Sequence, residues 1–461
     1  MKQLIWLRND LRLDDNPLFS QAQAEGPVTV VHYATPKQWQ QHHESPAKLG
    51  LKAALLNDIG QQLAAKGIEL ILLTVDTFTD IPQSLLKLCQ QHTFERIWFT
   101  EETPWNEVQR DKQVTNLLRQ HSIQVNSLPP DLIVNQPVLN KQALPFKVFT
   151  PYYKTWLQQL LASQQLPLKG PKKQADAFDW AMQSFPWAGD FRNDLWPGTE
   201  KAVRQKLRKF SQQRLLDYAE QRDYPATPGT STLSAYLAQG VLGPRRLLEA
   251  VQVSCAQAGK EWLDDDWLRE LAWRDFYRQL MTHFPHINKN QAFKQDTDRI
   301  IWRQDKTGLD AWSKGQTGFP IIDAAMRQLL QTGWMHNRLR MLAASFLTKL
   351  LFLDWREGER FFMQHLIDGE FAANNGGWQW SASTGCDAAP YFRVFNPTRQ
   401  SEKFDPEGEF IRRFVPELAD LSNKSIHNPS SEERLQAGYP EPVVDYKAAR
   451  QFAIDQFAAL K

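Results

Sequence analysis

The first 130 residues alternate short β-rich runs with helical patterns, and this alternation limits the possible folds more than any other feature of the chain. The candidate strands are Leu4–Leu7, Val28–Tyr33, Ile68–Val75, Arg96–Thr100 and Ile123–Asn126. The clearest helical stretches between them are Pro46–Lys66, Ile81–His92 and Trp105–Gln120. Such alternation predicts a parallel sheet that is covered by helices on both faces and binds ligands at the carboxyl ends of its strands. No GxGxxG follows the first strand and no Walker A motif occurs, which disfavours an ordinary dinucleotide site or a P-loop.

Two further regions follow this one along the chain. Residues 131–199 are rich in Pro, Gln and Trp, and we expect them to form an irregular connector wrapped over the surface. From about residue 200 the patterns are helical nearly to the end. The predicted helices are Lys201–Glu220, Thr232–Gln239, Pro244–Val253, Asp264–Phe284, Ile321–Leu330, Arg338–Leu353, Gly358–Leu366 and Tyr446–Leu460. The sequence therefore predicts an α/β domain with a Rossmann-like parallel sheet at 1–130, a connector at 131–199 and an all-α domain at 200–461.

Charge and cysteine content narrow the class of protein. The 461 residues include 54 Lys plus Arg and 52 Asp plus Glu, and this net charge of +2 excludes a globally basic nucleic-acid binder but not a local basic patch. The three cysteines are far apart and show no metal-ligand spacing, which is typical of a reducing cytoplasm. The start has no signal-peptide pattern, and the longest apolar stretch, 341–353, is too short to span a bilayer. We therefore expect a cytoplasmic protein without a membrane segment or a bound metal.

Hydrolase motifs are absent from the sequence, whereas aromatic segments are frequent. Nine of the 17 Trp residues lie between Trp262 and Trp380. In one of these segments Trp267, Glu270, Trp273 and Arg274 have the spacing of one helical stripe. Two indoles, a carboxylate and a guanidinium suit a wall that stacks a planar ligand and hydrogen-bonds its edge. A partly exposed helix seam without a ligand is the alternative interpretation.

A second segment, NNGGWQW at 374–380, is poor helix-forming material, and we expect a turn there. Its two glycines would let the backbone approach a ligand closely, and its two Asn side chains could meet the edge of a heterocycle without bringing charge. An ordinary turn with no ligand remains the alternative. The nearby run WMHNRLRM adds Asn337, Arg338 and Arg340, which suggest a helix that contacts phosphates beside an aromatic pocket.

These segments together resemble the DNA photolyase/cryptochrome family. The resemblance covers almost the whole chain, from LIWLRNDLRLDDNP at 4–17 to FDPEGEFIRRFVPEL at 404–418. Its most specific segments are TGFPIIDAAMRQL, TGWMHNRLRM, DWREGERFF and ANNGGWQWSASTGCDAAPYFR. Within the family the chain is most similar to the bacterial class I photolyases that act on cyclobutane pyrimidine dimers in DNA.

The resemblance implies a non-covalently bound FAD in the helical domain, active in its reduced anionic form. The matching flavin-site positions are Tyr218, Thr230, Ser231, Thr232, Leu233, Ser234, Trp267, Arg274, Asp368, Gly369, Glu370 and Asn374. Asn374 would face flavin N5, and Arg274 would pair with Asp368 near the ring. Thr232 and Glu370 depart from the residues usual in relatives, Arg and Asp, and this leaves the phosphate and ribose contacts open.

The implied activity is light-driven repair of DNA, in which reduced flavin donates one electron to a flipped-out dimer and later regains it. The residues that would line the dimer pocket are Glu270, Trp273, Asn337, Met341 and Trp380. Glu270 would hydrogen-bond the thymine edges and stabilise developing charge. The residues that would hold the flanking DNA are Arg222, Arg338, Arg393 and Gln400.

The resemblance also implies an electron relay and an antenna. Trp302, Trp355 and Trp378 match the family's tryptophan chain to the flavin. In the α/β domain Asn106 and Glu107 match the folate-binding members, and Lys289 would reach the folate tail. The expected antenna is 5,10-methenyltetrahydrofolate, and a deazaflavin or an empty site is the alternative.

Two other functions compete with repair by a monomeric enzyme. A signalling cryptochrome would share the fold, but many such proteins carry long C-terminal tails, whereas this chain ends soon after Tyr446–Leu460. A flavin oxidoreductase that works in the dark would need a second cofactor pocket, for which the sequence gives no signal. The complete set of dimer-pocket residues favours repair.

Overall fold

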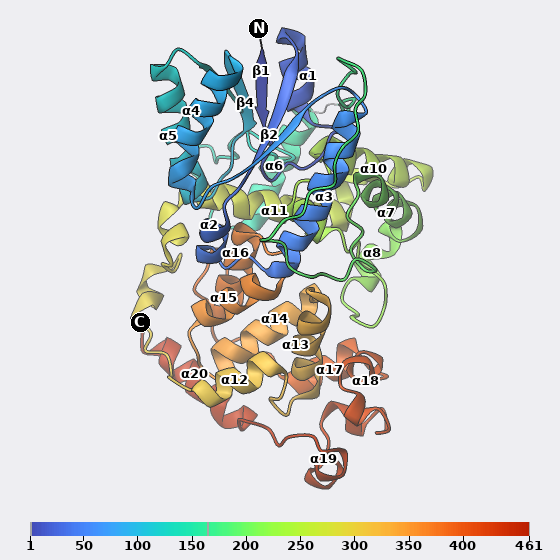
Figure 1. Cartoon of the computed structure of the whole chain (residues 1–461). Helices are drawn as coiled ribbons and strands as arrows, with labels where there is room; N and C mark the ends of the chain where they lie inside the picture. Colours follow the sequence, from blue (N-terminus) through green and yellow to red (C-terminus); the bar gives the residue numbers. More distant parts are fainter. Residues whose placement is uncertain (1, 164–165, 461) are drawn as a thin grey trace. The chain divides into compact units, whose positions relative to one another are not determined.

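The computed structural model of the chain describes residues 2–163 and 166–460, which fold into two compact units (Figure 1). The first unit combines Met1–Leu216 with Ser231–Pro285, and the second combines Asp217–Thr230 with His286–Lys461. The predicted domain limits at residues 131 and 200 remain predictions about units that fold by themselves. No helix in the described ranges has the length and apolar character needed to cross a bilayer.

A five-stranded parallel sheet lies in the first unit, as the strand–helix alternation predicts. The strands are β1 (Gln3–Trp6), β2 (Val28–Ala34), β3 (Leu70–Thr74), β4 (Arg96–Thr100) and β5 (Gln124–Leu128). Their order is β3-β2-β1-β4-β5, and every pair is parallel. The chain therefore changes direction across the sheet at β1, where crevices for ligands form in such sheets.

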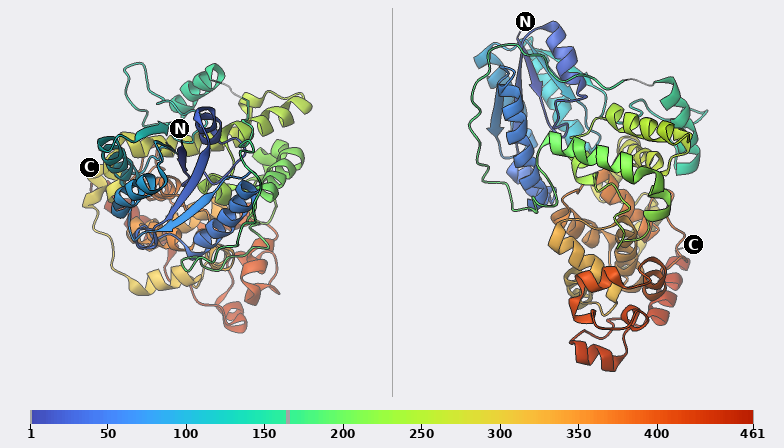
Figure 2. Two further views of the ribbon diagram at one scale, coloured as in Figure 1. Left: turned by 45° about the horizontal axis from the view of Figure 1, so that its top comes forward. Right: turned by 90° about the vertical axis from the view of Figure 1, so that its right-hand side faces the viewer.

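Helices cover both faces of this sheet (Figures 1 and 2). Its helices are α1 (Pro17–Glu25), α2 (Pro36–Gln41), α3 (Pro46–Ala64), α4 (Ile81–His92) and α5 (Trp105–Gln120). Alternate strand residues such as Leu4 and Trp6 form one core with α4 and α5, while α1 packs on the opposite face. Helix α3 begins in the favoured way, because the Ser45 side chain accepts a hydrogen bond from Lys48 N and Pro46 stands in the first turn.

The expectation of an irregular connector at 131–199 is wrong for one part of it. Helix α6 (Phe149–Ala162) lies there and packs on α11 (Asp266–His283). Its buried residues Phe149, Tyr152, Trp156 and Leu160 have helical spacing, and this apolar stripe is covered by α11. Another part of the connector does run over the surface of α3, where Asn57 of α3 exchanges hydrogen bonds of 2.9 and 3.1 Å with the Gln183 backbone.

The remaining helices confirm an all-α second half. The first unit adds α7 (Glu200–Gln213), α9 (Ser234–Ala238), α10 (Pro244–Gln257) and α11. The second unit contains α8 (Tyr218–Gln221), α12 (Lys306–Lys314), α13 (Pro320–Thr332), α14 (Asn337–Ser345), α15 (Trp355–His365), α16 (Phe371–Ala382), α17 (Pro397–Phe404), α18 (Glu409–Phe414), α19 (Ser431–Ala437) and α20 (Tyr446–Ala458). The predicted helix 338–353 ends earlier, because a π-helical turn at Phe346–Leu350 follows α14.

The turn predicted at 374–380 is a second error, since this run forms the middle of α16. The helix is fixed by side chains that local propensity ignores. Asn375 Nδ2 donates to Glu359 Oε1 at 3.1 Å, and Gln379 Nε2 donates to Asn375 Oδ1 at 2.9 Å. Each glycine costs a helix about 1 kcal/mol relative to alanine. Packing of α16 on α15 offsets that cost.

Candidate functional site

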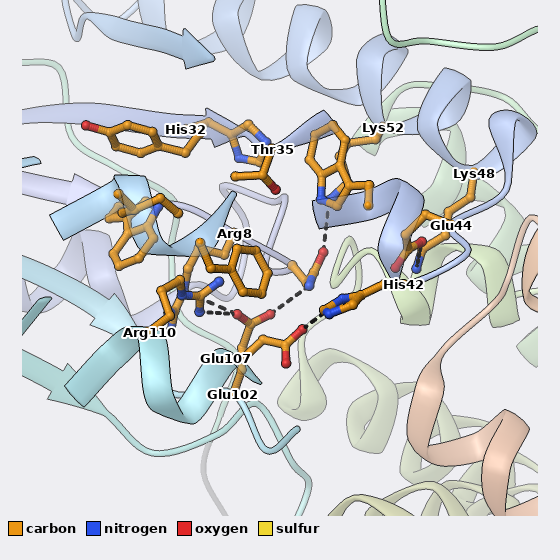
Figure 3. A pocket seen from close by; sticks show the side chains of 16 residues that line it. Arg8, His32, Thr35, His42, Glu44, Lys48, Lys52, Glu102, Glu107 and Arg110 are labelled. Atoms are coloured by element: carbon orange, nitrogen blue, oxygen red, sulfur yellow. Dashed lines mark hydrogen bonds and ion pairs between the residues drawn. The ribbon is translucent and has the colours of Figure 1, made fainter. Parts of the chain in front are cut away.

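A charged pocket lies at the carboxyl ends of β1, β2 and β4 in the first unit (Figure 3). Arg8 follows β1, Thr35 follows β2 and Glu102 follows β4, so the pocket occupies the edge where the parallel sheet predicts a ligand. Its enclosed volume is only about 50 Å³, which is room for a few water molecules. A ring ligand would therefore lie across the mouth of this pocket.

Salt bridges and hydrogen bonds fix the floor of this pocket. Arg110 Nη2 lies 2.6 Å from Glu102 Oε2, and Asn9 Nδ2 donates to Glu102 Oε1 at 2.7 Å. Burial raises the pKa of Glu102, but Arg8 and Arg110 outweigh it and bring that pKa to about 2. The two guanidinium groups also lie over the Trp6 ring, at 4.7 and 4.9 Å from its centroid. Glu102 is therefore a permanent anion and part of the scaffold.

Glu107, one of the predicted antenna residues, lines the same pocket and has a different protonation chemistry. Burial and the neighbouring Glu102 raise its pKa to about 7, although Arg110 opposes this rise. Its carboxylate lies 3.8 Å from His42 Nδ1. The other predicted residue of α5, Asn106, donates through Nδ2 to His42 Nε2 at 2.9 Å. His42, which the sequence did not single out, thus joins the two predicted antenna residues.

The predicted flavin residues of the first unit lie on α11 and in the segment that leads into α9. Thr232 has a positive φ of 49°, and Ser231 Oγ accepts from Leu233 N at 3.3 Å. Trp267 is buried, and its ring centroid lies 5.1 Å from that of Phe210. Arg274 Nη2 donates to Leu237 O at 2.9 Å, so α11 is tied directly to α9.

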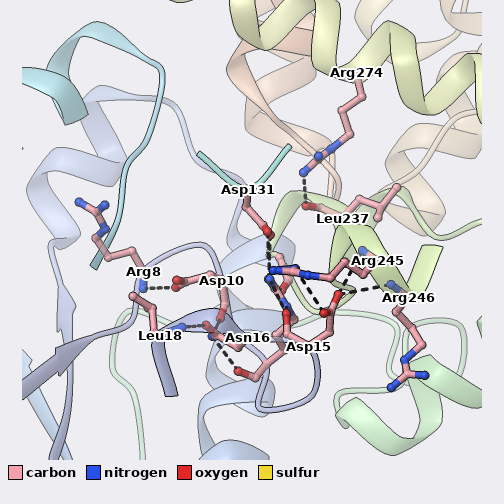
Figure 4. Close-up of polar contacts among 12 residues, drawn as sticks. Arg8, Asp10, Asp15, Asn16, Leu18, Asp131, Leu237, Arg245, Arg246 and Arg274 are labelled. Carbon is pink, nitrogen blue, oxygen red and sulfur yellow. Dashed lines mark hydrogen bonds and ion pairs between the residues drawn. The ribbon is translucent and has the colours of Figure 1, made fainter. Parts of the chain in front are cut away.

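A buried polar network holds the α9 and α10 segments against the loop after β1 (Figure 4). Arg12 donates to both carboxylate oxygens of Asp131, at 2.7 and 2.9 Å, and to Gly240 O at 2.8 Å. Asp15 Oδ2 accepts from the backbone N–H groups of Arg245 and Arg246 at the start of α10. These contacts fix the segment with the predicted flavin residues relative to the sheet.

The second unit brings together another part of the predicted flavin set. Asp368 Oδ2 lies 2.7 Å from Arg340 Nη2, which makes Arg340 a partner of Asp368 rather than an exposed phosphate ligand. The other oxygen of Asp368 is buried and has no hydrogen-bond partner among the described residues. The predicted Arg274–Asp368 pair joins the two units and stays a prediction.

Asn374 lies near a buried acid that sequence analysis missed. Asn374 Nδ2 donates to the backbone oxygen of Glu359 at 2.9 Å, which leaves Oδ1 as its acceptor for a ligand. Glu359 is 7% exposed, and burial raises its pKa to about 7 even though Asn375 hydrogen-bonds its carboxylate. The DWREGER motif contains this residue, but only the fold shows that it points inward.

The predicted dimer-pocket residues come from three helices. Glu270 and Trp273 lie on α11 in the first unit, while Asn337 and Met341 of α14 and Trp380 of α16 lie in the second. Asn337 and Met341 share one face of α14, and α14 packs on α16. Trp273 stacks face to face on Phe149, with centroids 3.7 Å apart and an interplanar angle of 7°. Phe149 is an unpredicted support of this wall.

The predicted DNA contacts of the second unit differ in their surroundings. Arg338 Nη2 lies 2.7 Å from Asp223 Oδ2, and its guanidinium covers the Phe404 ring at 4.4 Å. Arg222 lies over the Tyr218 ring at 5.7 Å. Arg393 is exposed and Gln400 is half-buried. Arg393 is therefore the most accessible cation of the predicted set.

The three predicted relay residues are all buried in the second unit. Trp302, Trp355 and Trp378 are 9%, 1% and 2% exposed. Trp378 Nε1 is a buried donor that has no acceptor among the described residues. Its ring lies edge-on to Trp312, with centroids 6.0 Å apart.

Comparison with known proteins decides the family. Residues 3–172 match the profile described as DNA photolyase, and residues 267–459 match the FAD binding domain of DNA photolyase. The chain belongs to the DNA photolyase family. It is 42% identical to a protein named deoxyribodipyrimidine photo-lyase from Escherichia coli, over 99% of this chain and 98% of that one. A protein of the same name from Vibrio cholerae is 41% identical over the full length of both chains.

Solved structures of photolyases and cryptochromes share the fold. A bacterial class III photolyase from Agrobacterium tumefaciens is 32% identical, with a TM-score of 0.89 over 100% of this chain and 97% of that one. A cryptochrome from Synechocystis is 26% identical, with a TM-score of 0.88 over 99% of both. An archaeal photolyase from Sulfolobus tokodaii, solved with two FAD molecules, is 30% identical, with a TM-score of 0.82 over 100% of both. The α/β and FAD-binding halves predicted from the sequence are thus those of this family.

Proposed function

We propose that this chain repairs cyclobutane pyrimidine dimers in DNA under light. The observation that carries the proposal is full-length similarity, at 41–42% identity, to proteins named deoxyribodipyrimidine photo-lyase. Residues 3–172 and 267–459 match the two family profiles, so this chain contains both halves of the family.

The cofactor would be FAD, in its reduced anionic form, bound by Asp368, Asn374 and the 230–234 segment. When bound, FAD would supply the electron that splits the dimer under light. The buried oxygen of Asp368 without a partner in the described part of the chain fits an N–H or O–H donor of FAD. Asn374 would hold a flavin N–H on Oδ1, because its amide nitrogen already donates to Glu359 O. A neutral amide at that position keeps a second negative charge away from an anionic ring.

The chain's own residues would bind and polarise the dimer. Trp273, held by Phe149, and Trp380 would form apolar walls, and Met341 and Asn337 would close the pocket from α14. Glu270 would hydrogen-bond the base edges and stabilise negative charge as it develops on the carbonyl oxygens. No nucleophile is required, which agrees with the absence of hydrolase motifs.

Trp302, Trp355 and Trp378 would form the relay that reduces oxidised flavin. All three side chains are buried away from water, and Trp378 Nε1 has no acceptor among the described groups. Indole is one of the side chains that lose an electron most readily, so three buried indoles are suitable sites for stepwise electron transfer.

The antenna would be 5,10-methenyltetrahydrofolate, lying across the pocket mouth on Glu107 and Asn106, with Lys289 near its tail. Glu107 can accept from the donors of a pterin edge once it is ionised. The narrow interior, about 50 Å³, favours this rim position over a deazaflavin sunk into the pocket.

The remaining features concern the setting of the enzyme. DNA would be held by Arg222, Arg338, Arg393 and Gln400. We further propose that the protein is a monomer and is cytoplasmic; its three cysteines are free, buried thiols, as expected in a reducing compartment.

One experiment separates repair from cryptochrome signalling, the alternative on the same fold. Purified protein is mixed with an oligonucleotide that carries one thymine dimer and is kept either in the dark or under blue light. Loss of the dimer only in light supports repair. Absence of repair by protein that contains fully reduced FAD contradicts it.

A further inference from the structure

A long stretch of the first unit is basic and contains no acid. Residues 132–175 carry six lysines and no Asp or Glu, although the whole chain is almost neutral. All six lysines are exposed. Apart from Phe149, which supports Trp273, none of the positions proposed above for flavin, dimer, relay or antenna lies in this stretch.

Part of this stretch is an ordered hairpin, residues 139–148. Leu139 and Pro145 form an isolated antiparallel bridge. Asn140 closes the turn, because its Oδ1 accepts from Gln142 N at 2.9 Å and from Leu144 N at 3.0 Å. Lys141 therefore lies on a defined turn, and Lys147 follows the bridge on the same hairpin.

The hairpin presents apolar side chains to solvent beside these lysines. Leu144 is 58% exposed and Val148 is 46% exposed. Together with Phe146, Pro151 and Phe284 they line a groove of about 510 Å³, a size typical of small-molecule sites. Lys147 stands at its rim, with Nζ 5.9 Å from the Phe284 ring centroid. An apolar groove with Lys147 at its rim and Lys141 on the adjoining turn suits a ligand with flat apolar rings and negative charges.

The groove is continuous with the proposed dimer wall. Val148 lines the groove, and the next residue, Phe149, stacks on Trp273 at 3.7 Å. A strand of DNA with its dimer against Trp273 would thus have neighbouring nucleotides within reach of the hairpin. Extrusion of a dimer leaves bases nearby without their pairing partners.

We propose that the hairpin 139–148 and Phe284 form a second DNA-binding surface, which takes an unpaired nucleotide beside the dimer. The base lies in the apolar groove against Phe146 and Phe284, and Lys141 and Lys147 neutralise phosphates. This inference rests on the proposed repair function. It adds a surface that binds single-stranded nucleotides whatever their sequence.

The test measures binding in the dark, separately from repair in light. The double variant Lys141→Ala/Lys147→Ala removes the two cations, and Leu144→Asn makes the groove polar without changing charge. The matched control, Lys87→Ala/Lys112→Ala, removes two exposed lysines of α4 and α5. FAD content and the melting curve verify that each variant is folded.

Affinity for a fluorescent duplex with one thymine dimer is measured against salt concentration. If each lysine neutralises one phosphate, the slope of log K against log salt becomes shallower by about 1.8 in the hairpin double variant and stays unchanged in the control. Leu144→Asn should weaken binding to an undamaged oligo-dT strand severalfold with an unchanged slope.

Equal binding by the hairpin variants and the control would overturn the inference. So would loss of binding to anionic lipid vesicles with DNA binding intact, because the surface would then serve a membrane. Wild-type protein that binds DNA through the hairpin but repairs no dimer in light would contradict the proposed function and leave this inference standing.

Discussion

The contact between Gly358 of α15 and Trp378 of α16 gives a quantitative test of the packing around the proposed relay. A Cβ atom at position 358 would lie 2.0 Å from Cη2 and 2.4 Å from Cζ3 of Trp378, and 2.6 Å from Leu347 Cδ2. Ordinary contacts of this kind begin at 3.4 Å. Gly358→Ala would therefore force α15, Trp378 or both to move by more than 1 Å.

The expected cost follows from two opposing effects. Alanine stabilises a helix by about 1 kcal/mol relative to glycine. Overpacking a filled core usually costs about 1–3 kcal/mol, and the clash here involves a rigid indole that is 2% exposed. Contacts of 2.0–2.6 Å place this clash at the upper end of that range, about 2–3 kcal/mol. After the alanine gain is subtracted, we expect a net loss of about 1–2 kcal/mol, which corresponds to a Tm decrease of roughly 2–8 °C for a unit of this size.

A matched glycine on the next helix provides the control. A Cβ atom at Gly377 of α16 would have no atom within 4 Å. Gly377→Ala should therefore raise Tm, because only the helix-propensity gain of about 1 kcal/mol remains. Thermal unfolding followed by tryptophan fluorescence compares both variants with the wild type.

Gly358→Ala should also slow photoreduction of oxidised flavin, because it displaces Trp378. A Gly358→Ala protein as stable as the wild type would refute the close packing of α15 and α16. Equal destabilisation by both substitutions would show that alanine is rejected for a reason other than the clash.

Three further substitutions test the proposed roles. Trp302→Phe should abolish the photoreduction of oxidised flavin, which is followed by flavin absorbance, but should spare repair by chemically reduced protein. Unchanged photoreduction would exclude Trp302 from the relay. Glu270→Gln should lower the repair quantum yield while FAD content stays constant, because a neutral amide stabilises the developing charge less well. Folate binding should weaken about tenfold from pH 8 to pH 6. Burial raises the pKa of Glu107 to about 7, and protonation of its carboxylate removes a hydrogen-bond acceptor for the ligand. Glu107→Gln should remove this pH dependence, whereas the control Glu101→Gln should retain it.

The stability of the protein should also depend on the protonation of Glu359, a buried acid whose pKa is raised. A carboxyl whose pKa is higher in the folded state stabilises the fold below its unfolded pKa, and this stabilisation is lost as pH rises through the folded pKa. The pKa of Glu359 is raised to about 7 by burial, so Glu359→Gln should gain stability relative to the wild type as pH rises from 5 to 8. A difference in Tm that is independent of pH would contradict the neutral state of Glu359 near pH 6.

The α/β half was predictable because its signals are local. Short runs rich in apolar, β-branched and aromatic residues, with short breaks between segments, mark the strands, and a parallel sheet requires the helices between them. Helix α6 was missed for a local reason as well. Its stripe of Phe149, Tyr152, Trp156 and Leu160 lies inside a region whose Pro and Gln content suggests a connector.

The site was less predictable because its decisive contacts are made by residues distant in the sequence. Nothing in NNGGWQW shows that the Asn375 and Gln379 side chains form buried hydrogen bonds or that Trp378 fills the space beside Gly358. In the sequence Glu359 is one of several charged residues of the DWREGER motif, and only the packing of α16 on α15 shows that it is buried. Asn106 and Glu107 were assigned from resemblance alone. His42, which contacts both of them, lies far away in the sequence, in the connection between α2 and α3.

The most direct test of the proposed function is repair of one defined dimer. Protein containing reduced FAD is mixed with a thymine-dimer oligonucleotide, illuminated at the absorption band of the flavin, and the dimer is quantified by the return of absorbance at the band of intact thymine. We predict recovery of thymine in proportion to the light absorbed, none in the dark, and a sharply lower yield for Glu270→Gln. Equal recovery in darkness, or none in light, would contradict light-driven repair by this chain.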